Sequence, residues 1–187
     1  MDEVIVSCKI NLSDTFFSTI TPNTIRFLNC DATASTSLRS VFTSRSKSVK
    51  LFEIRNLDAR NATSMKMFFN NSNGIESIVM RDLNVSKVTD MSSMFYNCSG
   101  AKTIDIANCN TSNVTDMSYM FSFCNNLTSL DVSGWDMTKV TDKRKMFTYC
   151  SKLKTIRMVG CNQTTIDKIK SALTNADIIN QVTIVTE

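Results

Sequence analysis

Cysteine and aspartate recur at a fixed spacing in this sequence, and both residue types can bind metal ions or take part in redox and acid–base chemistry. Three cysteines follow one another at steps of 26 residues: Cys98, Cys124 and Cys150. Three aspartates have the same step: Asp90, Asp116 and Asp142. The chain contains no histidine, which excludes a His-based triad, a His general base and a His-containing metal site. It also contains no CxxC pair, so a zinc ribbon or a thioredoxin-like site is unsupported.

Structural roles explain these ladders better than chemistry does. A free cysteine is commonly a small buried residue, so we expect each thiol to fill a core slot; a metal or redox ladder is the alternative. Stacked carboxylates would repel one another unless each accepted backbone N–H bonds at the start of a helix, so helix capping is favoured over a cation site. Methionines that recur beside phenylalanine are expected to be core residues rather than a copper site. We therefore predict no cofactor, no metal site and no enzymatic activity.

The ladders arise because a unit of 26 residues is repeated. Three segments align without gaps, namely VTDMSSMF from Val88, VTDMSYMF from Val114 and VTDKRKMF from Val140. The apolar residues from Val114 to Phe121 fall at i, i+3, i+6 and i+7, which is a helical spacing. Leu130 and Val132 instead alternate with polar residues, as in a strand. Each unit is therefore expected to contain a short helix followed by a short strand.

A unit of this size cannot bury an apolar face alone, but stacked units form a continuous core. We therefore expect residues 36–187 to form an α/β solenoid with a parallel sheet on one face. Residues 1–35 are expected to form a strand-rich N-terminal cap or a docking segment. At the other end, Thr165–Ala176 is predicted to be the longest helix and Gln181–Thr186 the closing strand, which together cap the array.

The central units also carry a family resemblance. The lines VTDMSSMFYNCSGAKTIDIANCNTSN and VTDMSYMFSFCNNLTSLDVSGWDMTK resemble the BspA-like leucine-rich repeats of bacterial surface proteins. The resemblance extends over most of the chain and weakens at its edges, where Ala62-Thr-Ser-Met lacks the aspartate and Lys143 stands where the family has methionine. It implies a leucine-rich repeat array with a surface-exposed, non-enzymatic binding or adhesion role, and it does not identify the ligand.

Side chains that the core does not need are the candidates for binding. In each strand, the positions between and after the two apolar residues should line one exposed face of the sheet, and solenoids bind ligands on such faces. We expect a protein or a cell-surface glycan to bind there. The residues predicted for this strand face are Glu53, Arg55, Arg81, Asp105, Asp131 and Arg157. The 26-residue step places Thr183 next in this series.

Charge and hydropathy restrict the partners and the location. The excess positive charge lies in residues 139–187, but aromatic residues do not interleave with these cations as they do in single-strand platforms, so we expect no nucleic-acid partner. No apolar stretch approaches the roughly 20 residues of a membrane helix, and the first residues lack the pattern of a secretory signal peptide. We expect exposure at a bacterial cell surface or on a virus particle, without membrane insertion and by a route that the sequence does not define.

The alternative function is structural. A virion decoration or fibre protein would assemble with copies of itself, as a homo-oligomer, or with other virion proteins. Its contacts would be made by the terminal segments, because repeat arrays leave open strand edges at their ends.

Overall fold

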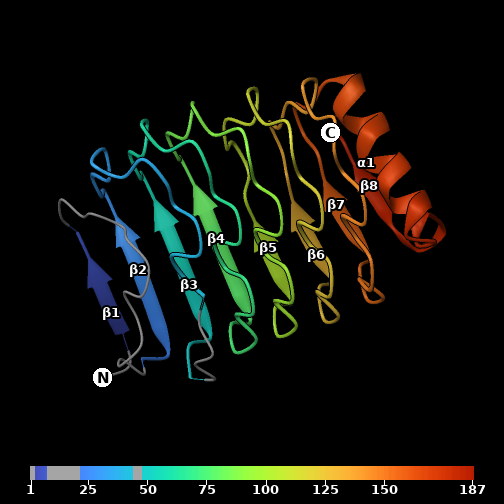
Figure 1. The fold of residues 1–187 in the computed structure, drawn as a ribbon. Helices are drawn as coiled ribbons and strands as arrows, with labels where there is room; N and C mark the ends of the chain where they lie inside the picture. Colours follow the sequence, from blue (N-terminus) through green and yellow to red (C-terminus); the bar gives the residue numbers. More distant parts are fainter. Residues whose placement is uncertain (1–2, 8–21, 44–47) are drawn as a thin grey trace.

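The computed structural model describes residues 3–7, 22–43 and 48–187, and these form a parallel β-solenoid in which every coil adds one strand to a single sheet (Figure 1). The strands follow the order of the chain, and each pairs in parallel with the next. Their bounds are β1 (Glu3–Val6), β2 (Thr24–Leu28), β3 (Leu51–Arg55), β4 (Ser77–Arg81), β5 (Thr103–Asp105), β6 (Ser129–Asp131), β7 (Thr155–Arg157) and β8 (Thr183–Val185). The predicted parallel sheet and the 26-residue step between most coils are confirmed.

One buried apolar residue in each coil fixes the strand register. The row across β4 to β7 consists of Ile78, Ile104, Leu130 and Ile156, which pair in line and are at most 1% exposed. Side chains alternate along a strand, so a slip by one residue would move the whole row to the solvent face. The register therefore follows from the hydrophobic pattern.

A stack of phenylalanine rings runs through the core beside this row. Its members are Phe69, Phe95, Phe121 and Phe147, all fully buried. Successive ring centroids are 5.4–5.7 Å apart, and the ring planes lie within 9° of parallel. Equivalent side chains of neighbouring coils are thus in direct contact, and each coil supplies one wall of the next coil's core.

The short helix expected in each unit is not formed, and this prediction is wrong. The segment opposite the sheet consists of successive turns, because two positions in each coil have a left-handed backbone: Met67 and Asn71, Ser93 and Asn97, Tyr119 and Phe123, Lys145 and Tyr149. A left-handed residue ends an α-helix. Alternate N–H groups bond to the following coil, as from Phe95 to the Met120 carbonyl at 2.9 Å, and intervening ones such as those of Met94 and Tyr96 close four-residue turns. The apolar residues at helical spacing face the core from these turns.

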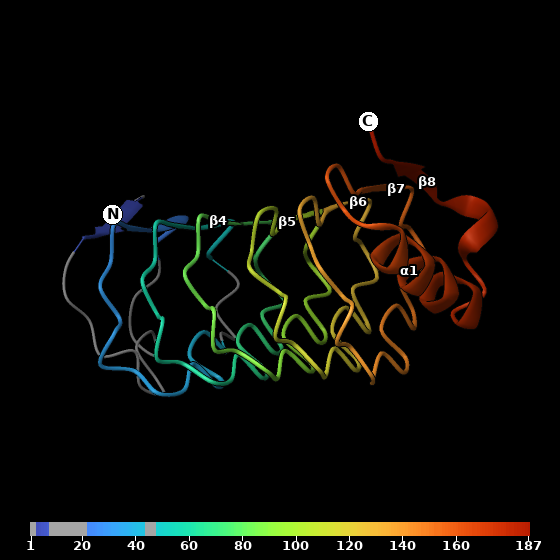
Figure 2. The ribbon, with the colours of Figure 1, turned by 90° about the horizontal axis from the view of Figure 1, so that it is seen from above.

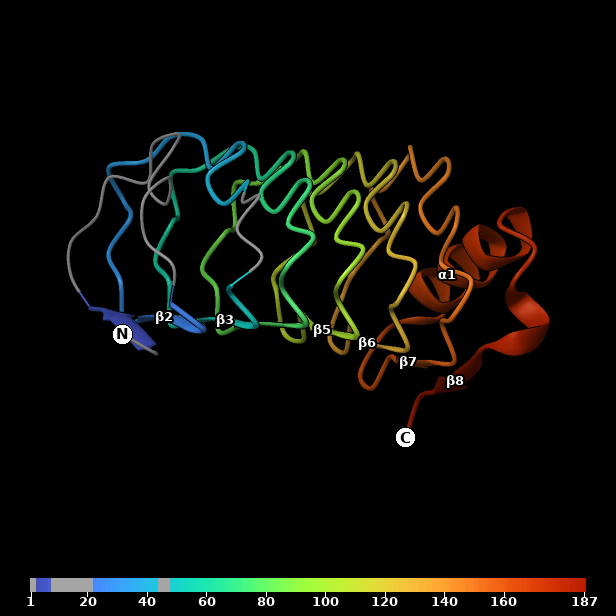
Figure 3. The same ribbon diagram turned by 90° about the horizontal axis from the view of Figure 1, so that it is seen from below.

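Among the described residues, α1 (Gln163–Asn175) is the one α-helix, and it lies where the longest helix was predicted. Its N-cap is Asn162, whose Oδ1 accepts a hydrogen bond from the Thr165 N–H at 2.8 Å. Figures 2 and 3 show α1 at the end of the array, beside the last coils and not across the outer face of the sheet. Lys168 Nζ fastens it there by donating to three carbonyl oxygens, those of Met137, Thr138 and Val140, at 2.7–3.0 Å.

The step from β7 to β8 corrects the predicted position of Thr183. The residues of α1 and of the short 3-10 helix η1 (Ile179–Gln181) lengthen this step, so that Ile156 pairs with Ile184 instead of the residue 26 positions on. Thr183 therefore faces Thr155, and Val185 is the neighbour of Arg157. The chain uses the extra residues to complete its cap before it returns to the sheet.

The predicted N-terminal cap is described only in part. β1 and β2 lie within residues 1–35 and form the first two strands of the sheet. Residues 1–2 and 8–21 of this segment lie outside the described residues. In the part of the chain that the structure covers, no helix has the length and apolar character needed to cross a membrane.

Substitutions at position 93 distinguish a left-handed turn from a helix, because the difference in stability between the glycine and alanine variants has opposite signs in the two structures. Ser93 has φ +55°, where a side chain costs about 1 kcal/mol relative to glycine. We expect Ser93→Gly to unfold at a higher urea concentration than Ser93→Ala, as measured by circular dichroism. The exposed Ser171 in α1 is the control, since a helix interior favours alanine over glycine by about 1 kcal/mol. If the segment around Ser93 were helical, alanine would be more stabilising than glycine at both position 93 and position 171.

Candidate functional site

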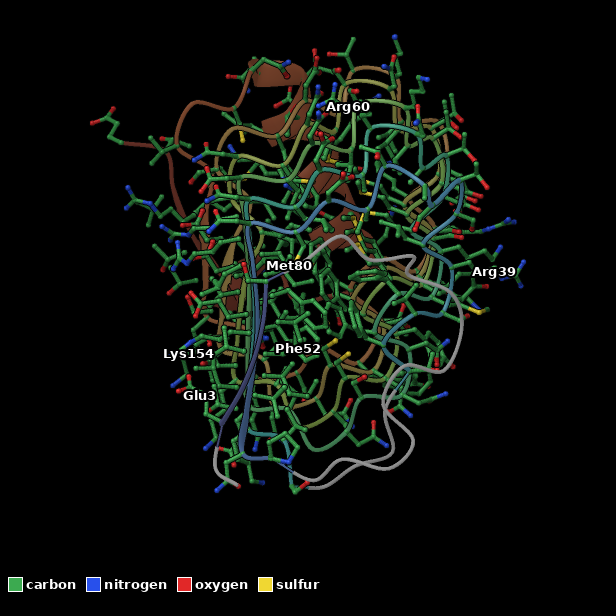
Figure 4. The ribbon with its side chains drawn as sticks, turned by 90° about the vertical axis from the view of Figure 1, so that its left-hand side faces the viewer. Glu3, Arg39, Phe52, Arg60, Met80 and Lys154 are labelled. Carbon is green, nitrogen blue, oxygen red and sulfur yellow. The ribbon has the colours of Figure 1, made fainter. Side chains whose placement is uncertain are left out.

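The outer face of the sheet is uncovered in the described part of the chain. The coils turn back on one side of the strands, and α1 closes the end of the array (Figures 2 and 3). Viewed along the array, Glu3 and Lys154 lie on the outer side of the sheet, Phe52 and Met80 point into the core, and Arg39 lies on the opposite surface (Figure 4). Parallel sheets are usually covered on both faces. An open face of a parallel sheet is therefore a candidate surface for binding another molecule.

The structure places all six predicted strand-face residues on this side, where they alternate with buried strand residues. Arg157 is exposed and the other five are half-buried. In the first strands, Glu53 lies between Arg26 and Arg55, with Arg26 Nε donating to Glu53 Oε2 at 2.7 Å, and Arg26 also contacts Glu3. Burial tends to raise the pKa of Glu53, but hydrogen bonds and charge from Arg55 and Arg26 outweigh burial and lower this pKa.

The later strands carry two further ion pairs on the same face. Arg81 Nε donates to Asp105 Oδ2 at 2.8 Å, and hydrogen bonding to Asp105 raises the pKa of Arg81. Arg157 Nε lies 3.7 Å from Asp131 Oδ2. The strand face is therefore a set of opposite charges that satisfy one another, within β3 and between neighbouring strands, and sequence reasoning had not anticipated this pairing.

Two more rows flank the charged row. One is a row of hydroxyl groups at the first strand positions, made up of Ser77, Thr103, Ser129, Thr155 and Thr183. The other lies at the rim, where Glu76 sits between Lys102 and Lys50, and hydrogen bonds from these two lysines lower its pKa. Hydroxyls and charges thus repeat at the strand spacing of about 4.8 Å, which suits hydrogen bonding to an extended polar ligand.

The cysteine ladder lies in the core, as predicted. Each Sγ of Cys98, Cys124 and Cys150 lies 3.0–3.2 Å from a phenylalanine carbonyl oxygen of the preceding coil. Burial raises the pKa of Cys98, Cys109 and Cys150 to about 12, and that of Cys124 well above its usual value. These thiols are therefore neutral at physiological pH and contribute packing.

The aspartates cap turns where helix capping was predicted. Asp90 Oδ1 and Asp116 Oδ1 each accept a hydrogen bond at 2.8 Å from the N–H two residues further on, at Ser92 and Ser118. Asp142 does the same with Arg144 at 3.1 Å. Each carboxylate is thus satisfied within its own turn. Within the described ranges, no three acidic or cysteine side chains gather as a metal site would require.

Two surface features were not expected from the sequence. One is a pocket of about 580 Å³ beside the start of β7, bordered by Gln181 and Thr183. The other is a ridge of partly exposed rings, Tyr96, Phe123 and Tyr149, with successive centroids 5.3 and 4.6 Å apart. Phe123 and Tyr149 occupy the repeat position that holds asparagine in two earlier coils. A comparison of the repeat units shows this change from asparagine to an aromatic residue, and it is the sequence signal from which the ridge could have been predicted.

The sequence model of one family matches the chain three times. The family is described as Mycoplasma protein of unknown function, DUF285, and the matched ranges are residues 10–102, 36–156 and 63–185. The chain belongs to this family. No curated protein matches the chain. The three DUF285 ranges begin 26 and 27 residues apart, which is the step of the solenoid, so the DUF285 pattern corresponds to consecutive coils and not to one fixed segment.

The DUF285 core thiols should be almost inert in the native state. Thiolate is the reactive form, and the raised pKa values leave very little of it at pH 8. We expect a Cys8→Ser chain, which removes the cysteine outside the described residues, to react with an aromatic disulfide reagent at no more than one thiol, the half-buried Cys161. In denaturant, all six remaining thiols should react. Rapid native reaction of two or more thiols would contradict the burial of the ladder.

Proposed function

We propose that the chain is a non-enzymatic recognition module of the BspA-like leucine-rich repeat type, exposed at a surface, that binds a protein or a cell-surface glycan through its strand face. The observation that supports this most is the uncovered outer face of the parallel sheet (Figures 2 and 3). A sheet face of this kind is the surface that solenoid proteins use for binding. The resemblance of the central units to repeats of bacterial surface proteins agrees with this role.

The ion pairs on the strand face suit exchange with a ligand. Arg81 and Asp105 are half-buried, and their pair is accessible to solvent. Exposed ion pairs contribute only about 0–1 kcal/mol each, so a ligand that supplies an equivalent charge replaces one partner at small cost. The rows of hydroxyls and charges also fix the direction and register in which an extended ligand lies. Specificity then depends on the order of charges along the array.

Reversing one ion pair tests the strand face without removing the pair. The double variant Arg81→Glu/Asp105→Arg keeps opposite charges on neighbouring strands but inverts their order. We expect it to bind cultured epithelial cells at least about tenfold more weakly, because like charges would meet across the interface. Binding of the fluorescently labelled chain is measured by flow cytometry, before and after protease or glycosidase treatment of the cells, which separates protein from glycan ligands.

Arg39→Glu is the matched control, because Arg39 is exposed on the surface opposite the sheet (Figure 4). It should bind like the unmodified chain. Equal weakening in both variants, or full binding by the inverted pair, would show that the strand face does not carry recognition.

A structural role in a virus particle is the second candidate, and the first edge of the sheet supports it. β1 pairs only with β2 among the described strands, and Ile5 on β1 is 56% exposed. Edge strands with exposed apolar side chains are templates for pairing with another chain. Copies of the chain would then associate through their terminal strands.

This second candidate predicts a molar mass that rises with protein concentration in light scattering under reducing conditions. Ile5→Lys should return the chain to the monomer mass of 21.0 kDa, because a charge on the edge opposes strand pairing. A monomer at every concentration would contradict assembly through β1. Oligomers that persist in Ile5→Lys would place the contact elsewhere.

A further inference from the structure

The change of step between β7 and β8 leaves a pocket at the C-terminal end of the sheet. Gln181 of η1 closes one side of it, because its Nε2 donates to the carbonyl oxygens of Ser151 at 3.1 Å and Leu153 at 3.2 Å. Its volume of about 580 Å³ lies within the range of about 300–1,000 Å³ that holds small ligands. The polar residues that line this terminal pocket include Thr128, Ser151, Lys152, Lys154, Thr155 and Gln181.

Two lysines bring uncompensated positive charge to the terminal pocket. Lys152 Nζ donates to the neutral amide oxygen of Asn126 at 2.8 Å. Lys154, which lies on the outer side of the sheet (Figure 4), has no hydrogen-bond or ion-pair partner for its ammonium group within the described residues. The surrounding coil, residues 139–162, has a single acidic residue, Asp142. Its basic residues are Lys139, Lys143, Arg144, Lys145, Lys152, Lys154 and Arg157. An anionic group is the ligand that this imbalance favours.

Tyr149 carries an exposed aromatic ring two residues before the pocket-lining Ser151 in the chain. It is 62% exposed, and its Cα lies within about 7 Å of that of the lining residue Ser151, because two residues of chain span no more. Its backbone is left-handed, with φ +64°, which is unfavourable for a bulky side chain and acceptable for asparagine. Asn71 and Asn97 hold the equivalent position in earlier coils. Phe123 has the same backbone angle in the preceding coil, so the exposure of Tyr149, and not its backbone, makes this ring available for a contact outside the chain.

We propose that this end of the solenoid binds an acidic saccharide. The carboxylate or sulfate group of the sugar lies between Lys152 and Lys154 in the terminal pocket, and the apolar C–H face of a sugar ring packs on Tyr149. Hydroxyl groups of the sugar bond to the threonine, serine and glutamine side chains of the lining. The proposal deepens the recognition role inferred above and rests on it for the biological setting, but it uses none of the ion pairs of the strand face.

A sugar fits these groups better than a nucleic-acid strand does. Single-strand platforms stack successive bases on separate rings, whereas Phe123 and Tyr149 already pack on one another with centroids 4.6 Å apart. A pyranose has one apolar face and a rim of hydroxyls, and each hydroxyl both donates and accepts hydrogen bonds. Those needs are met by the exposed ring of Tyr149 together with a pocket of neutral polar groups and two cations.

The test is isothermal titration calorimetry of the full chain with three defined sugars: 3′-sialyllactose, which carries a carboxylate, a sulfated heparin disaccharide, and neutral lactose. We expect at least one acidic sugar to bind at least tenfold more tightly than lactose, and its affinity to fall as salt rises, because salt screens the lysines. The acidic sugar that binds identifies carboxylate or sulfate as the natural group. No binding by either acidic sugar, or equal binding by lactose, would overturn the proposal.

Substitutions separate the terminal pocket from the general positive charge of the coil. Lys154→Met should weaken binding of the acidic sugar at least tenfold. Lys139→Met is the matched control, because it removes the same charge from the same coil at a residue that does not line the pocket, and it should leave binding within about twofold. Equal losses in the two variants would show that overall charge and not a site binds the sugar, and would overturn the proposal.

Tyr149→Asn introduces the asparagine that two earlier coils have at the same repeat position. The chain should therefore fold with an unchanged or higher melting temperature. It should nevertheless lose at least fivefold in affinity for the acidic sugar. Retained affinity would remove Tyr149 from the site. The inverted Arg81–Asp105 pair should bind the sugar normally, so sugar binding can fail while the effect of that variant on cell binding still supports the strand face.

Discussion

Every coil of this solenoid must advance along the array by about one strand spacing on each of its sides. On the sheet side, backbone hydrogen bonds set that distance at about 4.8 Å. In the core, the phenylalanine stack keeps equivalent rings 5.4–5.7 Å apart, and on the far side alternate N–H groups bond to the next coil. Equivalent residues are consequently always neighbours, and the ladders of cysteine, aspartate and surface charge are results of this one constraint.

The regular parts of the fold follow from sequence because this constraint repeats the same signal in every unit. The step, the parallel sheet and the buried rows are all periodic. The helix prediction failed because successive turns place apolar residues on one face at the same spacing as a helix does. The informative residues are those with a positive φ: at the strand ends, Asn56, Asp82, Asn108, Gly134 and Gly160 share one left-handed position, and asparagine, aspartate and glycine are the residues that tolerate it.

The candidate site divides in the same way. The outward positions of the strands are fixed by alternation, so all six strand-face residues could be predicted. Their pairing could not, because Glu53 meets Arg26, and Arg81 meets Asp105, only through contacts between neighbouring strands. The terminal pocket lies where the periodicity ends, at a step that the intervening residues of α1 and η1 lengthen. The repeat pattern alone could not predict this pocket, because the pattern describes the regular coils and not the place where they are interrupted.

The cap formed by Lys168 has a consequence for how such a chain changes in evolution. Its ammonium group binds three carbonyl oxygens of the last coil, so this end has a finished surface that depends on one particular neighbour. An internal coil has no such dependence, because both of its sides fit a copy of itself. Duplication or loss of one 26-residue segment inside the array would change the length and the charge order of the sheet. The C-terminal cap and the pocket beside it would be retained together.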